Sequence, residues 1–426
     1  MTTNMKSNRV LSGMRPTGRL HIGHYFGALQ NWVKLQNDAT NDCFYFIADW
    51  HALTSDYADT AAIAENSVQI AIDYLASGLD PAKSTIFLQS LVPEHAELHL
   101  LLSMVTPLGW LERIPTYKEQ IENVMNKDLH TYGFLGYPTL QTADIVMYSD
   151  PGKSLSVPVG EDQVSHVEFS RELVRRFNLF YGFNVSSEIF TAENRTSTRN
   201  ALFRLLDVPA HQPIFPETAE ITAEQRMISR SLIRQRVLEM GFENFFEKLL
   251  PGLKPFFSFE SVLEEPGVLL TQTPRIPGLD GRKMSKSYGN AISLSETDAD
   301  IRSKTKVMVT DPARKRRTDP GNPDVCPVYD WHKLFSSKET LDWAAQGCRT
   351  AAIGCIECKS KMADHLIRWI EPVRARRIEY EQNPKRVLEI LDSGSTSARK
   401  SAQKTMDRVR TAIFNWPRKR QEITGS

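Results

Sequence analysis

Short apolar runs alternate with amphipathic stretches along the first third of the chain. Residues 10–13, 43–48 and 85–88 are apolar over the length of a buried strand, and the second run is rich in aromatic side chains. Residues 24–35 and 61–77 carry apolar side chains at helical spacing. This order of strand, helix, strand, helix and strand predicts a parallel sheet with helices on its faces.

Helical spacing dominates the rest of the chain, and Gly394 and Pro417 are expected to interrupt its last helices. The expected fold class is α/β, with a Rossmann-like parallel sheet, a helical insertion and an all-helical C-terminal domain. The boundaries that we expect are a Rossmann-like domain over residues 1–190 with a helical insertion at about 92–165, an extra helical insert of unknown role over 191–260, the end of the sheet domain over 261–297, and a helical domain over 298–426.

The composition is that of an ordinary globular protein. Of its residues, 41% are hydrophobic and 24% are charged. Its length of 426 residues is enough for two or three domains with their own cores. The formal net charge is only +1, so a nucleic-acid site requires local clustering of basic residues. No apolar run approaches the ~18 residues that span a bilayer, and the polar residues 1–9 do not resemble a secretory signal. A cytoplasmic location is therefore expected.

The first motif that carries chemistry lies at residues 16–24, between the first predicted strand and the first predicted helix. A phosphate bound there would meet free N–H groups and the positive end of the helix dipole. Gly18 and Gly23 allow the ligand to approach the backbone, and His21 and His24 can donate hydrogen bonds to phosphate oxygens. The alternative is that the two histidines only cap the helix.

A second motif lies far downstream at residues 283–287, with the sequence KMSKS. Glycines flank it on both sides, which predicts a mobile phosphate-binding loop. The ammonium groups of Lys283 and Lys286 can neutralise a triphosphate and stabilise departing pyrophosphate. The alternative for these two lysines alone is a solvated basic turn.

Together the two motifs resemble the "HIGH" and "KMSKS" signatures of the class I aminoacyl-tRNA synthetases, letter for letter. Residues 11–18, 48–54, 137–144 and 157–163 are similar to segments of the bacterial tryptophanyl branch. The resemblance covers nearly the whole chain except the region around residues 190–260. It implies a tryptophan–tRNA ligase that uses ATP to convert L-tryptophan into tryptophanyl-AMP and then charges tRNA(Trp).

The resemblance also implies roles for individual residues. The catalytic residues implied are His21, His24, Lys283 and Lys286. The ATP-binding residues implied are Arg15, Pro16, Thr17, Gly23, His24, Gly160, Glu161, Asp162, Ile276, Lys283, Met284, Ser285, Lys286 and Ser287. The tryptophan-binding residues implied are Asp144, Tyr137, Gln141, His51, Val157, Val159 and Gln163, with Asp144 accepting the indole N–H.

Three alternatives remain open from the sequence. Asp144 can accept a hydrogen bond from a phenol as well as from an indole, so the tyrosyl branch is the nearest one. A small-molecule nucleotidyltransferase of the same fold superfamily is the second, and a catalytically silent protein that binds RNA is the third. Val157 and Val159 also fit a plain buried strand.

Four of the five cysteines lie close together in the sequence, with the spacing C-x21-C-x6-C-x2-C. They are Cys326, Cys348, Cys355 and Cys358. Such a set in a cytosolic protein indicates a metal or iron–sulfur site. Some bacterial tryptophanyl relatives hold a [4Fe–4S] cluster with a first gap one residue longer. The resemblance therefore favours [4Fe–4S], with zinc or no metal as alternatives.

Basic residues gather in two places in the C-terminal region. The first is residues 314–317. The second set is Arg374, Arg376, Arg377, Lys385, Arg386, Arg399, Lys400, Lys404, Arg408 and Arg410. These charges fit phosphate contacts, and the resemblance implies an anticodon-binding domain there. It also implies Mg²⁺ bound with ATP and a homodimer formed through residues 92–148, and no membrane partner is expected.

Overall fold

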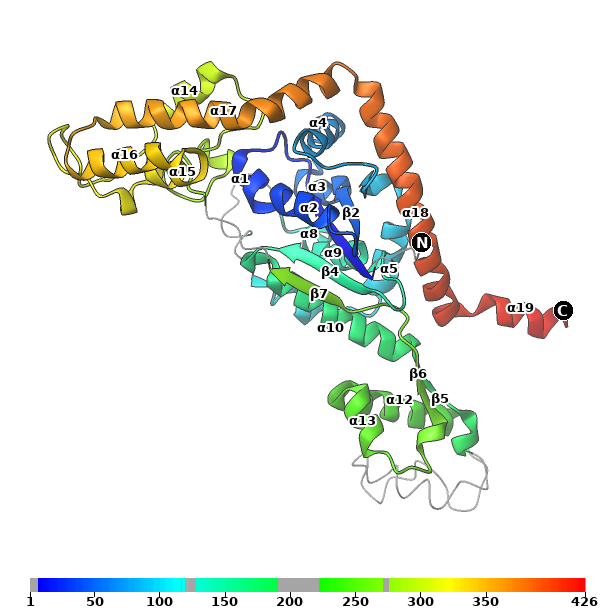
Figure 1. Cartoon of the computed structure of the whole chain (residues 1–426). Helices are drawn as coiled ribbons and strands as arrows, with labels where there is room; N and C mark the ends of the chain where they lie inside the picture. Colours follow the sequence, from blue (N-terminus) through cyan, green and yellow to red (C-terminus); the bar gives the residue numbers. More distant parts are fainter. Residues whose placement is uncertain are drawn as a thin grey trace.

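The computed structural model describes residues 7–115, 117, 118, 121, 128–190, 222–270 and 276–425. At its centre is a sheet of five parallel strands in the order β3-β2-β1-β4-β7. The strands are β1 (Asn8–Met14), β2 (Asn41–Ile47), β3 (Ser84–Leu88), β4 (Ser154–Val159) and β7 (Pro266–Leu270). Helices cover both faces of this sheet (Figure 1), which confirms the α/β fold expected from the sequence.

The apolar runs of the sequence become strands because both faces of the sheet are buried. Along β2, the side chains of Cys43 and Tyr45 pack into the core on one face. The side chains of Phe44 and Phe46, which alternate with them, pack into the core on the other face. Two hydrophobic cores therefore lie back to back across the sheet.

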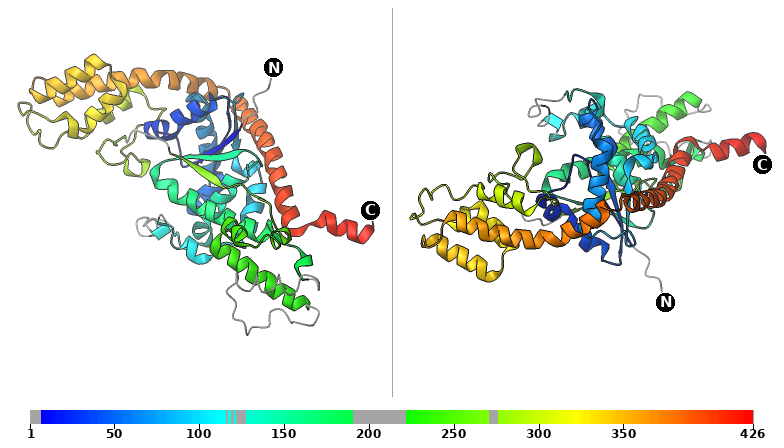
Figure 2. Two further views of the ribbon diagram at one scale, coloured as in Figure 1. Left: turned by 60° about the horizontal axis from the view of Figure 1, so that its bottom comes forward. Right: turned by 90° about the horizontal axis from the view of Figure 1, so that it is seen from above.

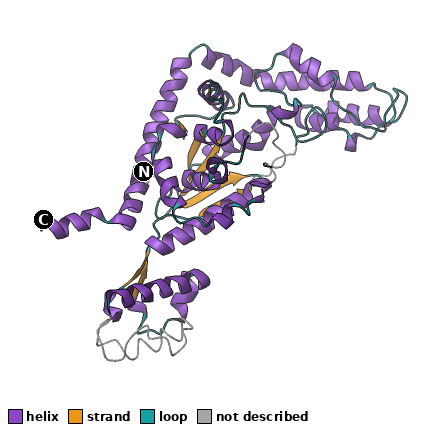
Figure 3. Ribbon diagram, turned by 180° about the vertical axis from the view of Figure 1, so that it is seen from behind, coloured by secondary structure: helices purple, strands orange, loops and turns teal. Residues whose placement is uncertain are grey.

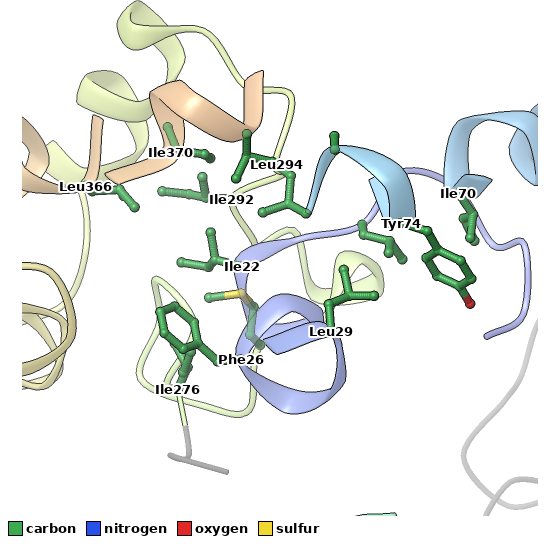
Figure 4. Close-up of a cluster of buried hydrophobic side chains, with 14 of the residues drawn as sticks. Ile22, Phe26, Leu29, Ile70, Tyr74, Ile276, Ile292, Leu294, Leu366 and Ile370 are labelled. Carbon is green, nitrogen blue, oxygen red and sulfur yellow. The ribbon is translucent and has the colours of Figure 1, made fainter. Parts of the chain in front are cut away.

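The first core lies beneath the first signature motif. Its helical elements from the first part of the chain are α1 (Ile22–His24), a π-helical turn (Tyr25–Leu29), α2 (Gln30–Gln36) and α4 (Ile63–Ala76), whereas α3 (Asp49–Asp56), which follows β2, adds no residue to it. Figure 4 shows Ile22 and Phe26 of these elements beside Ile292 and Leu294, which follow the second motif, and beside Ile370 from the C-terminal helices. Segments that are far apart in the sequence thus share one core at the site.

The second core packs against helices of the middle region. These are α5 (Glu94–Ser103), α6 (Leu108–Leu111), α8 (Tyr132–Leu135), α9 (Tyr137–Val146) and α10 (Val164–Tyr181). Residues 92–165 were expected to be a helical insertion, but β4 lies within this range and pairs with β1 and β7. The helical part ends at Val146, and the apolar residues that follow it belong to the sheet.

A small body projects from the sheet domain below α10 (Figure 1), and in the left view of Figure 2 its green helices lie at the bottom of the molecule. Its parts are β5 (Phe183–Val185), β6 (Phe257–Phe259), α12 (Ala223–Met240) and α13 (Phe242–Lys248). Phe183, Ile233 and Phe245 are buried in its own core. Of the helical insert expected over residues 191–260, residues 191–221 lie outside the described residues. The rest contains these helices and also β6, which pairs antiparallel with β5.

The C-terminal region is helical, as expected. Its helices are α14 (Asp298–Lys306), α15 (Pro327–Phe335), α16 (Lys338–Arg349), α17 (Cys355–Glu381), α18 (Pro384–Phe414) and α19 (Trp416–Thr424). Figure 3 shows them as one purple arm that extends past the orange sheet and then returns alongside it. Pro417 lies in the first turn of α19, where proline suits a helix start. The expectation that Gly394 interrupts a helix is wrong, because it lies inside α18.

Helix α18 packs directly on the edge strand β3. A Cβ atom at Gly394 would lie 1.9 Å from the backbone oxygen of Ile86, so only glycine allows this approach. The hydroxyl of Ser395 accepts a hydrogen bond from the Leu88 N–H at 3.3 Å. The edge of the sheet is thereby covered by a helix. Within the described ranges, no helix combines the length and the apolar character that crossing a membrane requires.

Candidate active site

The main cavity of the sheet domain opens where two neighbouring strands separate. β1 pairs with β2 along its whole length, but it pairs with β4 only from Asn8 to Val10. Beyond these residues lies a cavity of about 380 Å³, which is within the usual size of small-molecule sites. The strand order reverses between β1 and β4, and ligands of open α/β sheets bind outside the carboxyl ends of the strands at such a point.

All seven residues expected to bind tryptophan line this cavity. They are His51, Tyr137, Gln141, Asp144, Val157, Val159 and Gln163. The two valines are residues of β4, so the functional and the plain-strand interpretations both describe them. Phe134 and His166 also line the cavity and were not expected, because a buried aromatic residue in a helical segment carries no sequence signal of its own.

Asp144 is the most constrained polar group of the cavity. Its Oδ2 lies 2.8 Å from His51 Nε2, and its Oδ1 lies 2.6 Å from His95 Nδ1. The side-chain amide of Gln89 donates to the same Oδ1 at 2.7 Å. The phenol oxygen of Tyr148 lies 2.7 Å from His95 Nε2 on the far side.

These contacts keep Asp144 ionised although it is only 1% exposed. Burial acts to raise its pKa, but the hydrogen bonds from His51 and His95 outweigh burial and lower the pKa to about 2. Gln89, His95 and Tyr148 were missed at the sequence level. They lie in apolar segments, and contacts over such distances along the chain leave no local pattern.

The two histidines of the first signature lie together at the start of α1. Their rings stack with centroids 3.6 Å apart, and His24 Nδ1 accepts the His21 backbone N–H at 3.2 Å. Burial, together with the positive charge of Lys286, lowers the pKa of His21 to about 4. Burial, then the neighbouring His21, also lowers the pKa of His24. Both rings are therefore neutral donors at neutral pH.

The second signature loop lies against the first. Lys286 Nζ is 3.4 Å from the backbone oxygen of Thr17, which precedes Gly18. Ile22 N–H donates to the Ile292 oxygen at 3.0 Å, and Leu294 N–H donates to the Leu20 oxygen at 2.9 Å. The first motif and the segment after the second motif are thus joined as a short antiparallel pair.

A buried asparagine shapes the second loop. Asn290 Oδ1 accepts the Ser285 N–H at 2.7 Å, and its amide donates to Asp280 at 2.7 Å and to the Lys283 oxygen at 3.2 Å. Met284 is buried in the core, whereas the Lys283 side chain is 75% exposed and lies 3.8 Å from Asp162. The loop is anchored at Met284 and Asn290, while Lys283 faces solvent.

Of the residues expected to bind ATP, Arg15 and Gly160 line this cavity. Glu161 and Asp162 form a short turn after β4, and Ile276 is buried beside the second loop. The remaining residues of that set all belong to the two signature motifs. They are Pro16, Thr17, Gly23, His24, Lys283, Met284, Ser285, Lys286 and Ser287.

The four cysteines gather at the N-terminal end of α17. Burial, followed by the charges of Cys326, Cys348 and Cys355, raises the pKa of Cys358 to about 12, so the four thiols are neighbours. Arg314 Nη1 lies 3.7 Å from Cys348 Sγ. In the part of the chain that the structure describes, no three His, Cys, Asp or Glu side chains are close enough to hold one metal ion. The residue types fit a sulfur-ligated group, but their spacing does not fit a single ion.

Six of the ten basic residues in the second set expected to face RNA instead hold α17 and α18 to the sheet domain. Arg377 pairs with buried Asp73, and Arg374 donates to the Glu296 oxygen. The other such contacts are Arg376 with the Ala76 oxygen, Arg399 with Glu94, Arg408 with the Ser149 oxygen and Arg410 with Glu97. A surplus of arginine in a sequence cannot distinguish a solvated face from an interface inside the protein.

Comparisons with known proteins agree with this geometry. The family model of class I tRNA synthetases (W and Y) matches residues 3–200 and 247–370. A tryptophan–tRNA ligase of Ralstonia nicotianae is 48% identical over 96% of this chain and 99% of its own length. One from Thermotoga maritima is 40% identical over 95% and 98%.

A solved structure supports the same assignment at the level of the fold. The tryptophanyl-tRNA synthetase of Campylobacter jejuni, crystallised with ADP and tryptophan, is 27% identical and has a TM-score of 0.70. It covers 95% of this chain, and the match spans 99% of that chain. The chain therefore belongs to the class I tRNA synthetases and, among them, to the tryptophan–tRNA ligases.

Proposed function

We propose that the chain charges tRNA(Trp) in two steps at the β1/β4 cavity. L-tryptophan and ATP first give tryptophanyl-AMP and pyrophosphate, and tryptophan then passes to the 3′ end of the tRNA. The observation that carries this proposal is the position of ionised, buried Asp144 in a cavity whose opening is flanked by both signature loops. An aromatic amino acid and a nucleotide can meet there.

On the amino-acid side, Asp144 accepts the indole N–H. Tyr137, Gln141, His51, Val157 and Val159 enclose the ring and its backbone atoms, and Gln163 approaches the ammonium group. The relevant support is that all of these residues line one cavity at the switch point of the sheet. This makes the cavity complementary to a large aromatic side chain with a ring donor.

On the ATP side, Gly160, Glu161 and Asp162 hold the ribose and adenine, with Ile276 near the base. His21 and His24 donate to phosphate oxygens as uncharged groups, which their lowered pKa values support. The remaining residues of the two loops, including Arg15 and Lys283, contact the phosphates. Mg²⁺ arrives with ATP, because carboxylates for an all-protein magnesium cage are not gathered at this opening in the described residues.

The activation step is an in-line displacement at phosphorus. A carboxylate oxygen of tryptophan bonds to the α-phosphorus while the bond to the pyrophosphate oxygen breaks. The ammonium groups of Lys283 and Lys286 stabilise the charge that develops on pyrophosphate. The ribose hydroxyl of tRNA then attacks the activated carbonyl, and AMP leaves. Positioning and charge stabilisation supply the catalysis, and no covalent enzyme intermediate is required.

Exchange of labelled pyrophosphate into ATP tests the first step. We expect exchange with tryptophan and none with tyrosine, and a large loss in Lys286→Ala. Lys34→Ala is a matched control, because Lys34 is an exposed lysine on α2 away from the loops. Exchange with tyrosine alone would keep the class and overturn the specificity. Full activity in Lys286→Ala would overturn the role of the second loop.

For the RNA, we propose that the exposed part of residues 314–317 contacts the anticodon stem-loop. Arg316, Arg317 and Lys361 line an open cavity of about 770 Å³ at the start of α17, whereas Arg314 is buried and donates to backbone oxygens. Arg316→Ala combined with Arg317→Ala should raise KM for tRNA in charging and leave pyrophosphate exchange unchanged. Unchanged KM for tRNA would remove this contact.

We also propose that Cys326, Cys348, Cys355 and Cys358 hold a [4Fe–4S] cluster with a structural role. The support is that the charges of the other three cysteines act on Cys358, that Arg314 lies beside Cys348, and that four cysteine sulfurs are the ligand set of such a cluster. Protein purified without oxygen should contain iron and acid-labile sulfide, and Cys348→Ser should lose both while Cys43→Ser keeps them. Zinc alone, or no metal, would contradict the cluster.

Finally, we propose a homodimer in the cytoplasm. Apolar side chains remain exposed on α5, directly after it, and on α6 and α8, and the four largest fractions there are Leu100 53%, Met104 69%, Leu108 63% and Tyr132 65%. These side chains would be buried against a second copy. Sedimentation should give a dimer, and Met104→Glu with Leu108→Glu should give a monomer. A monomeric parent protein would contradict the interface.

A further inference from the structure

The hydrogen bonds of Asp144 leave it a single free acceptor position. A carboxylate oxygen accepts two hydrogen bonds through its two lone pairs. Oδ1 is filled by His95 Nδ1 at 2.6 Å and Gln89 Nε2 at 2.7 Å. Among the residues that the structure describes, Oδ2 takes only His51 Nε2, at 2.8 Å. One position therefore remains for a ligand, and it lies on Oδ2 beside His51.

The two groups that fill Oδ1 are themselves held in place. Gln89 Oε1 accepts the Trp50 backbone N–H at 3.1 Å, so its NH₂ group must face the carboxylate. His95 Nε2 lies 2.7 Å from the Tyr148 phenol, which donates to it in the neutral tautomer whose Nδ1 carries the proton toward Asp144. Gln89, His95 and Tyr148 are all 0% exposed. None of these donors can exchange roles without leaving a buried polar group unpaired.

We propose that Gln89 and His95 are specificity-positioning residues: they saturate Asp144 Oδ1 and so direct Oδ2, beside His51, at the ring N–H of the amino acid. This proposal rests on the proposed function of the cavity. Neither residue touches the substrate, and both act through the carboxylate. The ligand class that satisfies the site is an aromatic amino acid with one ring donor. A ring without a donor leaves a buried acceptor unpaired, which is strongly unfavourable.

The measurement is the ratio of kcat/KM in pyrophosphate exchange for tryptophan over its benzothiophene analogue, in which sulfur replaces the ring N–H. The parent protein should favour tryptophan on the order of 10⁴-fold, as expected of a site built around a substrate donor. His95→Leu removes the donor to Oδ1 and should lower the ratio about tenfold or more, because Asp144 can then turn. A purely structural role would lower kcat/KM for both amino acids and leave the ratio unchanged.

His95→Asn is the matched rescue variant. The asparagine amide reaches about the place of the imidazole Nδ1, so the ratio should stay within about threefold of the parent value. Gln89→Met gives a second, volume-conserving test with the same expected fall as His95→Leu. Thermal unfolding shows which variants are folded. Tyr148→Phe, which deletes one hydroxyl, should give a smaller fall and carries the test if the larger changes do not fold.

The outcomes separate this inference from the proposed function. A parent protein that shows no exchange with tryptophan would remove the proposed function itself. A parent protein that exchanges normally, with folded variants that all keep its ratio, would overturn only the role of Gln89 and His95. A fall in His95→Leu and Gln89→Met with recovery in His95→Asn would establish it.

Discussion

At the scale of single residues, burial decides how the first signature works. His21 and His24 are enclosed by the core beneath α1, and solvation no longer stabilises their charged forms. Their stacking at 3.6 Å would also be opposed by two positive charges. In the proposed function, the neutral imidazoles donate hydrogen bonds to phosphate oxygens, and the lysines of the second motif supply positive charge.

The lowered pKa of His21 predicts a pH-dependent stability. The folded pKa is about 4 and the ordinary value is 6.5, so between these values the unfolded chain binds a proton that the folded chain does not. Stability is therefore complete above about pH 6.5 and falls as the pH drops toward 4. At about pH 5 this proton binding lowers the free energy of unfolding by roughly 2 kcal/mol. Urea unfolding of His21→Asn should lose this part of the pH dependence, and an unchanged pH dependence would contradict it.

Gly23 packs so closely against the His21 ring that one added carbon atom would disturb it. A Cβ atom there would lie 2.9 Å from Cε1 and Nδ1 of His21, so Gly23→Ala must displace that ring. Exchange of pyrophosphate should fall about tenfold or more, mainly in kcat, because small displacements of a positioned group are costly in catalysis. Gly252→Ala is the control, since no atom lies within 4 Å of its added carbon. Equal activity of the two variants would exclude a role for the His21 ring.

The sequence predicted these residues better than it predicted their neighbours. His21, Lys286 and Asp144 stand in motifs, and the structure brings them to one opening. Gln89 and His95 do not stand in a recognisable motif, because the role proposed for them depends on contacts with the Asp144 carboxylate on α9. A buried polar side chain becomes informative only when its partner is known.

At the scale of elements, the first three strands followed from their apolar runs, but β4, β7 and the packing of the helices on the sheet did not. Periodicity shows that a helix has an apolar face and does not show which surface covers that face. Gly394 is the clearest case. As a helix breaker it predicted a boundary, yet in α18 it is the point of closest approach to β3. Glycine inside a helix can mark close packing as well as an end.

The close packing at Gly394 predicts a large effect of one methyl group. Gly394→Ala places a carbon 1.9 Å from the Ile86 oxygen, and no rotation of a side chain relieves a contact with backbone. The free energy of unfolding should fall by about 2 kcal/mol or more. Ser393→Ala, an exposed change in the preceding residue, should alter it by no more than about 0.5 kcal/mol. Chemical denaturation measures both, and equal stability would mean that α18 does not contact β3 in this way.

At the scale of the whole molecule, one helix joins the distant parts. α17 runs for 27 residues from Cys355 to Glu381, which corresponds to roughly 40 Å. Its first turn carries two of the clustered cysteines, and its last turns pack on α4 of the sheet domain. There Asp73 Oδ2 accepts the N–H of Leu20 at 2.7 Å, directly before the first signature. The C-terminal region and the first signature motif are thus connected through one buried carboxylate.

The ion pair between Arg377 of α17 and Asp73 of α4 is the key contact of this junction, since the two side chains are 2% and 0% exposed. Arg377→Met leaves Asp73 as an unpaired buried charge and should cost about 3–5 kcal/mol of unfolding free energy. Adding Asp73→Asn removes that charge and keeps an oxygen for the Leu20 N–H, so the double variant should regain most of the stability. Pyrophosphate exchange should fall and recover in parallel, because Leu20 positions His21.

Arg368→Met on the same helix is the matched control, because Arg368 is exposed and donates within α17 to the Asp364 oxygen. It should leave both the stability and the exchange rate near the parent values. A double variant as unstable as Arg377→Met would mean that the lost packing of the arginine, and not the unpaired carboxylate, causes the effect. Recovery of stability without recovery of exchange would mean that the folded junction is not sufficient for activity. The first signature motif would then require Asp73 in its charged form.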